Sequence, residues 1–168
     1  MGDVDAGHEQ IDILLNCTVL SNFALVGRLD LLQTAVGGRA ATTEAVIQEF
    51  NAGIALGYFP QVSLEWLPVL PLSPEEQATY QQIHPRLGAG EASCLAVAHH
   101  RGLKVATDDG DSRRYAQRTG IAISGTLGIL VQLVRSNILT LQEGNAILAA
   151  MIQQGYRAPE ADLSALGE

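Results

Sequence analysis

Residues 87–116 read LGAGEASCLAVAHHRGLKVATDDGDSRRYA and carry the strongest structural signal in the chain. From Glu91 onward, small and apolar residues recur on one helical face, and Gly102 predicts the end of that helix. A short buried strand over residues 103–107 follows and ends at Asp108 and Asp109. In open parallel sheets, ligands bind beyond the carboxyl ends of the strands. The segment therefore predicts a helix-to-strand unit of an α/β fold, with three carboxylates near one candidate metal position.

The rest of the chain alternates in the same way between short apolar runs and amphipathic segments. Extended segments are expected at 11–15, 62–69 and 121–124. Helices are expected at 18–26, 29–36, 44–56, 74–84, 112–118, 125–135 and 141–153, with Thr43 and Ser73 as N-caps. This pattern predicts an α/β fold, with a central parallel sheet of about four to five strands flanked by helices on both faces.

Length and composition favour a single globular domain. The chain has 168 residues, of which 47% are hydrophobic and 17% are charged, so it is long enough for a real core and too apolar for disorder. We expect the domain to span residues 11–157, between a disordered lead at 1–10 and an irregular tail at 158–168.

The net charge of −8 excludes a broadly basic nucleic-acid surface. It leaves room for a local basic patch around Arg113, Arg114 and Arg118. The two cysteines, Cys17 and Cys94, lack CxxC spacing and lie in apolar segments, which favours reduced, buried thiols over a disulfide.

The N-terminal segment lacks the basic region of a secretory signal. The longest apolar run, at 121–134, is interrupted by polar residues and glycines and is shorter than a membrane span. We therefore expect a soluble, cytoplasmic protein.

Five segments carry a family resemblance when they are taken in order: LLNCTVLSNFALVGRLDLL, TTEAVIQEF, LGAGEASCLAVA, VATDDGDSRRYA and ISGTLGIL. Together they resemble the PIN-domain nucleases over about residues 11–157, and within them the VapC-like toxin branch with a Gly-Glu-Ala helix and an Asp-Asp-x-x-x-Arg motif. The resemblance implies a metal-dependent endoribonuclease that uses Mg²⁺ or Mn²⁺ and cleaves RNA. It also implies a small antitoxin partner and, often, a homodimer.

The family's acidic quartet falls on Asn16, Glu49, Glu91 and Asp109. The resemblance makes Glu91 and Asp109 the main metal ligands, with Asn16 in the usual aspartate position and Glu49 in support. Asparagine keeps the shape and one oxygen ligand but removes a negative charge, so the resemblance implies impaired catalysis. The asparagine is either natural or a replacement made to silence a toxic nuclease.

The expected chemistry explains the choice of carboxylates. Phosphodiester hydrolysis needs a water deprotonated near neutral pH and charge neutralised on the phosphate, and hard oxygen ligands around Mg²⁺ provide both. Without a cation, clustered carboxylates repel one another, so their pKa values should be raised.

Each acidic candidate also has a plainer explanation. Glu91 can be a first-turn acid favoured by the helix dipole, and Glu49 a solvated residue on a helix face. Asp108 and Asp109 can form a polar turn, with Asp109 or Asp111 as the N-cap. We favour Asp109 as the ligand and Asp108 as its neighbour on the substrate side.

Two further residues are candidates for substrate binding. Arg113 matches the family arginine and can hold a phosphate, or else pair with Asp109 or Asp111. Thr126 begins a helix whose amides can meet a phosphate, although a simple capping turn also explains it.

Two other classes of function compete with the nuclease. One is a PIN-fold module that binds RNA or protein without catalysis, for which Asn16 is the main support. The other is a flavodoxin-like or receiver-type domain, which needs a lysine after a later strand and a mid-chain acceptor aspartate. Neither occurs in register.

Overall fold

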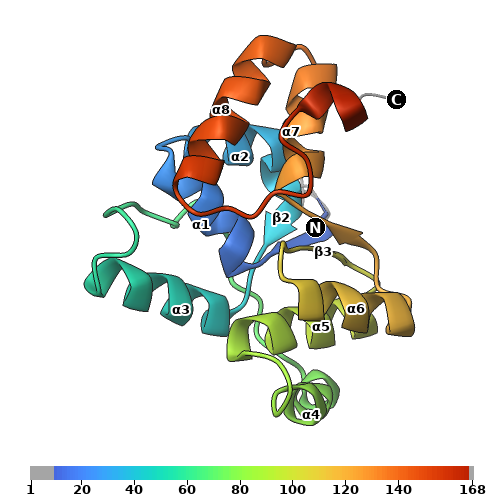
Figure 1. Cartoon of the computed structure of the whole chain (residues 1–168). Coiled ribbons are helices and arrows are strands. Elements are labelled where there is room, and N and C mark those ends of the chain that lie inside the picture. Colours follow the sequence, from blue (N-terminus) through green and yellow to red (C-terminus); the bar gives the residue numbers. More distant parts are fainter. Residues whose placement is uncertain (1–9, 167–168) are drawn as a thin grey trace, which may run out of the picture.

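The computed structural model describes residues 10–166 and is built around a parallel sheet (Figure 1). The strand order is β2-β1-β3-β4. The strands are β1 (Ile13–Leu15), β2 (Ala40–Ala41), β3 (Lys104–Ala106) and β4 (Ile123–Ser124). At the centre, Leu15 of β1 pairs with Ala106 of β3. The residues that follow these two strands, Asn16 and Thr107, therefore lie side by side at one edge of the sheet.

Helices cover both faces of this sheet, as predicted (Figure 1). One layer contains α1 (Cys17–Leu25), α2 (Leu29–Val36), α7 (Thr126–Arg135) and α8 (Leu141–Gln153). The other contains α3 (Glu44–Ala55), α4 (Pro74–Ile83), α5 (Ala89–Arg101) and α6 (Gly110–Thr119). The α/β fold with a four-stranded parallel sheet is thus confirmed.

The caps read from the sequence lie where they were predicted. The side chains of Thr43 and Ser73 accept hydrogen bonds from the first turns of α3 and α4, and Ser73 forms a capping box with Glu76. Gly102 ends α5 in the left-handed conformation, at a φ of 68°. Both cysteines are free and buried, also as predicted.

Two elements differ from the sequence-based expectation. The segment 62–69 forms no strand, and only Val69 pairs, through a single bridge to Thr42. Its apolar character is explained by packing, since Leu67 is buried against the core. Strand β2 was not predicted, because its two alanines carry no β signal.

The C-terminal segment is more ordered than the predicted irregular tail. A 3₁₀ helix at Leu163–Leu166 packs on α7 and α8, and the Leu163 side chain is buried. The predicted disordered lead lies outside the described residues, apart from residue 10. Within residues 10–166, no helix is both long enough and apolar enough to cross a membrane.

Candidate active site

Asn16 lies at the centre of the site, where β1 ends and α1 begins. It is fully buried, and its Oδ1 accepts a hydrogen bond of 2.8 Å from the Cys17 amide. Because that amide can only donate, Oδ1 must face it, which turns Nδ2 toward Thr107. Nδ2 donates to Thr107 Oγ1 at 3.2 Å. Asn16 therefore ties the ends of the two central strands together as a neutral amide.

Glu49 reaches the same point from α3. The position of Gly90, in the first turn of α5, explains how: a Cβ there would lie 2.5 Å from Glu49 Oε1 and 3.4 Å from Asn16 Oδ1. The missing side chain at Gly90 thus leaves room for both oxygens. Glu49 has an exposed side chain, but its carboxylate faces the site and is not an isolated solvated group.

Glu91 lies in the first turn of α5, beside Asp109 of the neighbouring strand end. Burial raises the pKa of Glu91, and the charge of Asp109 adds to the effect, while a hydrogen bond from the Glu91 amide opposes it. Glu49 is exposed as a residue, but its carboxyl group is partly buried; this burial raises the pKa of Glu49, and the charges of Glu91 and Asp109 add to the effect. These shifts are those expected of clustered carboxylates without a counter-charge.

No cation offsets this cluster within the described part of the chain. Among residues 10–166, no lysine, arginine or histidine forms an ion pair with Glu49, Glu91 or Asp109. Cys17 borders the cluster, and burial together with the charges of Glu49 and Glu91 raises the pKa of its thiol to about 12. The thiol is therefore neutral, and the site presents oxygen donors.

The two consecutive aspartates after β3 have different surroundings. Asp109 is the N-cap of α6 and accepts a hydrogen bond from the Ser112 amide through Oδ2 at 2.9 Å. Its Oδ1 accepts no hydrogen bond from residues 10–166. The capping interpretation is thus correct for Asp109 and wrong for Asp111, and it leaves one carboxylate oxygen of Asp109 available.

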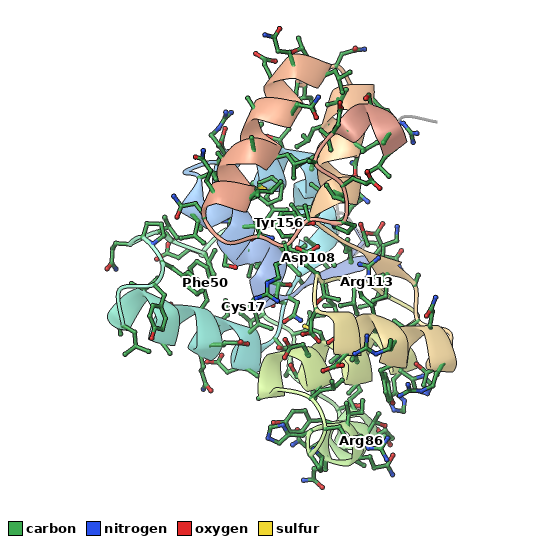
Figure 2. All side chains as sticks on the ribbon, viewed as in Figure 1. Cys17, Phe50, Arg86, Asp108, Arg113 and Tyr156 are labelled. Atoms are coloured by element: carbon green, nitrogen blue, oxygen red, sulfur yellow. The ribbon has the colours of Figure 1, made fainter. Side chains whose placement is uncertain are left out.

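Asp108 is instead held on both of its oxygens. Oδ1 accepts from the Thr126 amide at 2.9 Å, and Oδ2 accepts from the Thr126 hydroxyl at 2.5 Å and from Asn22 Nδ2 at 3.0 Å. Tyr156 lies against it (Figure 2), and its pKa is raised by burial, then by the charge of Asp108 and a hydrogen bond to it. Asp108 therefore joins β3 to α1, α7 and the C-terminal segment.

These contacts change the roles expected of two candidates. Thr126 is fully buried, and both its amide and its hydroxyl are used by Asp108, so neither is offered to a phosphate. Arg113 forms neither of the expected ion pairs, because its Nη1 donates to the carbonyls of Thr107 at 2.9 Å and Ser124 at 3.4 Å. Asp111 pairs with Arg114 instead.

The comparison with protein-family models matches residues 12–166 to a family described as a PIN domain. The chain belongs to the PIN-domain family. The resemblance read from the sequence is confirmed at this level, and a nuclease-type fold follows from it. The comparison with curated proteins finds no match.

The donor set of this PIN domain fits a hard divalent cation. It consists of carboxylate and amide oxygens, which are the ligands that Mg²⁺ and Mn²⁺ prefer. Among residues 10–166, no three His, Cys, Asp or Glu side chains form a ready metal cage. Mg²⁺ keeps several waters and binds through one or two carboxylates, so it does not need such a cage. Glu91 and Asp109 are the residues that would hold it, with Asn16 beside them.

Sequence reasoning missed the residues that support Asp108. Thr18 accepts a hydrogen bond from the Asp108 amide at 2.9 Å, and Asn22 donates to the carboxylate. Thr18 and Asn22 are four residues apart on α1 and so share a helix face, a spacing that can be recognised in sequence. Tyr156 belongs to an irregular segment with no comparable signal.

Proposed function

We propose that this PIN domain is a metal-dependent endoribonuclease of toxin–antitoxin type, and that Asn16 impairs its hydrolysis of RNA. The observation that supports the proposal is the group formed by Glu49, Glu91 and Asp109 around Asn16. Their oxygens gather at the carboxyl ends of β1 and β3, and no cation of the described chain compensates them.

The residues divide the work of hydrolysis between them. Glu91 and Asp109 would hold a divalent cation, which would supply a coordinated water of lowered pKa and neutralise phosphate charge. Glu49 is suited to accept the proton of the attacking water, because its raised pKa brings it closer to neutral pH. Arg113 fixes the strand ends on which Asp109 is carried.

Asn16 weakens this site because it is neutral. An aspartate at position 16 would complete a quartet of carboxylates with the three acidic residues. Divalent-cation affinity depends on the number of charged ligands. The amide also directs a donor, Nδ2, into the site toward Thr107. We therefore infer reduced metal affinity and a low residual rate.

Cleavage of a mixed pool of single-stranded RNA by the chain and by its Asn16→Asp variant tests the proposal. Each protein is incubated with Mg²⁺, with Mn²⁺ and with a chelator. Metal-dependent cuts that appear or rise sharply in the variant support a nuclease disabled by one charge. Absence of cleavage by both proteins contradicts the nuclease proposal.

That second result would favour a PIN module that binds RNA or protein without catalysis. One observation supports this alternative: both polar atoms of the buried Asn16 amide are hydrogen-bonded, so a neutral residue satisfies its surroundings. RNA binding without cleavage by the Asn16→Asp variant would distinguish it from the nuclease.

The partner belongs to the same proposal. We infer a small antitoxin that inserts a helix into the active-site groove, since a net charge of −8 suits a partner with basic segments. We also infer that the protein is cytoplasmic and forms a homodimer. Co-expression with the product of the adjacent reading frame should yield a stable complex whose mass gives the stoichiometry. Failure to form any complex would contradict the toxin assignment.

Gly90→Ala provides a test of the space that Glu49 occupies. The new Cβ would displace Glu49 Oε1, so RNA cleavage in the Asn16→Asp background should fall by roughly 10-fold. Stability should change little, because the preference for alanine over glycine in a helix, about 1 kcal/mol, is offset by the approach of the new Cβ to within 3.3 Å of Cγ2 of the buried Val46. RNA cleavage rates and thermal unfolding measure the two effects.

Gly128→Ala is the matched control, because Gly128 is also helical and the nearest atom to its new Cβ, Ser124 Oγ, is 3.4 Å away. This variant should retain the cleavage rate. Equal loss in both variants would mean that the helices, and not Glu49, respond to the added methyl group.

A further inference from the structure

A hollow lies between the end of α4 and the face of α6. It has a volume of about 470 Å³, and its lining includes Arg86, Leu87, Asp111, Arg114, Tyr115 and Arg118. We refer to it as the arginine cleft. Both α4 and α6 pack against α5 (Figure 1), and Arg86 follows the end of α4 (Figure 2).

Each wall of the arginine cleft is followed or preceded along the chain by a carboxylate of the candidate active site. On one wall, Leu87 precedes Gly88, the N-cap of the helix that carries Glu91 in its first turn. On the other, α6 begins at its N-cap Asp109, and a Cβ at Gly110 would lie 3.5 Å from Arg114 Nη1. The cleft and the carboxylates therefore share the first turns of α5 and α6 as their common border.

The charge of the cleft is opposite to that of the chain. Three arginines and one aspartate line it, whereas the whole chain carries a net charge of −8. The aspartate, Asp111, pairs with Arg114, but both side chains are 65% exposed. Such surface pairs contribute little stability, so a phosphate can replace the carboxylate and bind the guanidinium bidentately.

An aromatic ring lies among these charges. Tyr115 is half-buried, and the guanidinium carbon of Arg118 lies 6.0 Å from the centre of its ring. Arg114 and Arg118 are one helical turn apart, or about 6 Å along α6. Positive groups that track a backbone beside an aromatic platform are the usual means of binding single-stranded nucleic acid.

The wall formed by α4 is held in place before any ligand binds. Glu76 of α4 accepts hydrogen bonds from Arg101 of α5 at 2.7 and 2.9 Å. Hydrogen bonding to Arg101 lowers the pKa of Glu76 to about 2, so the bridge persists at neutral pH. A preorganised wall loses less entropy when a ligand binds.

We propose that the arginine cleft binds the backbone of single-stranded RNA next to the scissile bond, an inference that rests on the proposed nuclease function for its choice of RNA. Arg114 and Arg118 bind successive phosphates from α6, and Arg86 contacts the strand from the opposite wall. The Tyr115 ring supports a base.

The test measures RNA binding without cleavage. A fluorescein-labelled oligouridylate of about ten nucleotides, with 2′-O-methyl riboses that prevent cleavage, is titrated in chelator over a KCl series and followed by anisotropy. The Arg114→Gln/Arg118→Gln variant should bind at least about 10-fold more weakly, with a salt slope lower by about 1.4. Arg86→Gln should weaken binding by about three-fold and lower the slope by about 0.7.

The control is Arg28→Gln/Arg39→Gln, which changes the net charge equally. Both arginines form exposed pairs with aspartates, and neither lines the cleft. Binding by this variant should stay within about two-fold of the unmodified chain, because phosphate contacts are local. Equal weakening in both double variants, or no RNA binding by the unmodified chain, would overturn the proposal. Displacement of RNA by an equal concentration of polyglutamate would assign the cleft to acidic peptides instead.

This result is independent of the cleavage assay. If the Asn16→Asp variant cuts RNA but the arginine substitutions leave RNA affinity unchanged, the nuclease proposal stands and the cleft proposal falls. If the cleft variants lose RNA affinity and no form of the chain cuts RNA, the cleft stands and the nuclease falls.

Discussion

Replacing Asn16 with aspartate should increase Mn²⁺-dependent RNA cleavage by roughly 100-fold or more, because a charged ligand is restored beside Glu91 and Asp109. The isosteric change keeps the oxygen that accepts from the Cys17 amide. It replaces the Nδ2 donor that faces Thr107 with a second carboxylate oxygen. Initial rates with Mn²⁺ and Mg²⁺, each against chelator, measure the effect.

The same substitution should destabilise the metal-free protein. Residue 16 is fully buried and faces Glu49 across Gly90, so the new charge is desolvated beside a like charge. An uncompensated buried charge costs about 3 kcal/mol, and roughly 2–4 °C of Tm is lost per kcal/mol in a domain of this size. We expect a Tm lower by about 6–12 °C in chelator, and a larger rise on adding Mn²⁺ than the unmodified chain shows.

Asn22→Asp is the matched control for Asn16→Asp. It makes the same change from amide to acid on α1, but the new carboxylate faces Asp108 and Thr126 instead of the carboxylate cluster. It should lower the Tm without producing cleavage. Cleavage by both variants would mean that any added negative charge near the strand ends restores activity. Stability unchanged by Asn16→Asp would contradict the burial argument.

Local signals explain why much of the fold was predictable. The boundaries of α4 and α5 follow from a capping box at Ser73 and a left-handed glycine at Gly102, and both depend on neighbouring residues alone. Strand β2 forms because it pairs with β1, and its two alanines give no local sequence signal of this pairing. The apolar residues 62–69 have the pattern of a strand, but their position beyond β2 leaves them a single bridge.

The sequence was enough to predict which residues lie at the candidate site, but not which hydrogen bonds they form there. Strand ends and motif order brought Asn16 and Asp109 to one edge of the sheet. The sequence did not reveal that Asp108 is fully bonded or that Arg113 binds carbonyl groups, because their partners Asn22 and Ser124 lie on other elements. Such long-range partners are set by packing.

Glu91→Gln should have opposite effects on activity and on stability. In the Asn16→Asp background, loss of a main metal ligand should reduce cleavage by roughly 100-fold or more. In the otherwise unmodified chain without metal, the same change should raise the Tm at pH 7. The gain follows from removing a charge that burial and Asp109 disfavour.

The sign of the pH dependence follows from the raised pKa of Glu91. The folded state binds the Glu91 proton more tightly than the unfolded state does, so stability falls as pH rises from the ordinary carboxyl pKa of 4.5 through the raised folded value. Above the folded value the penalty is complete. The Tm advantage of Glu91→Gln should therefore be small below pH 4.5 and reach its full size above the folded pKa, in thermal unfolding measured across this range.

Glu75→Gln separates this effect from the helix dipole. Glu75 is also a first-turn glutamate, but it lies on α4 and is exposed. Loss of its charge removes only dipole stabilisation, about 0.3–1 kcal/mol, so the Tm should fall slightly. If Glu91→Gln also lowered the Tm in chelator, Glu91 would act as an ordinary first-turn acid. If Glu91→Gln instead raised the Tm and abolished metal-dependent cleavage, Glu91 would be a metal ligand whose charge destabilises the metal-free fold.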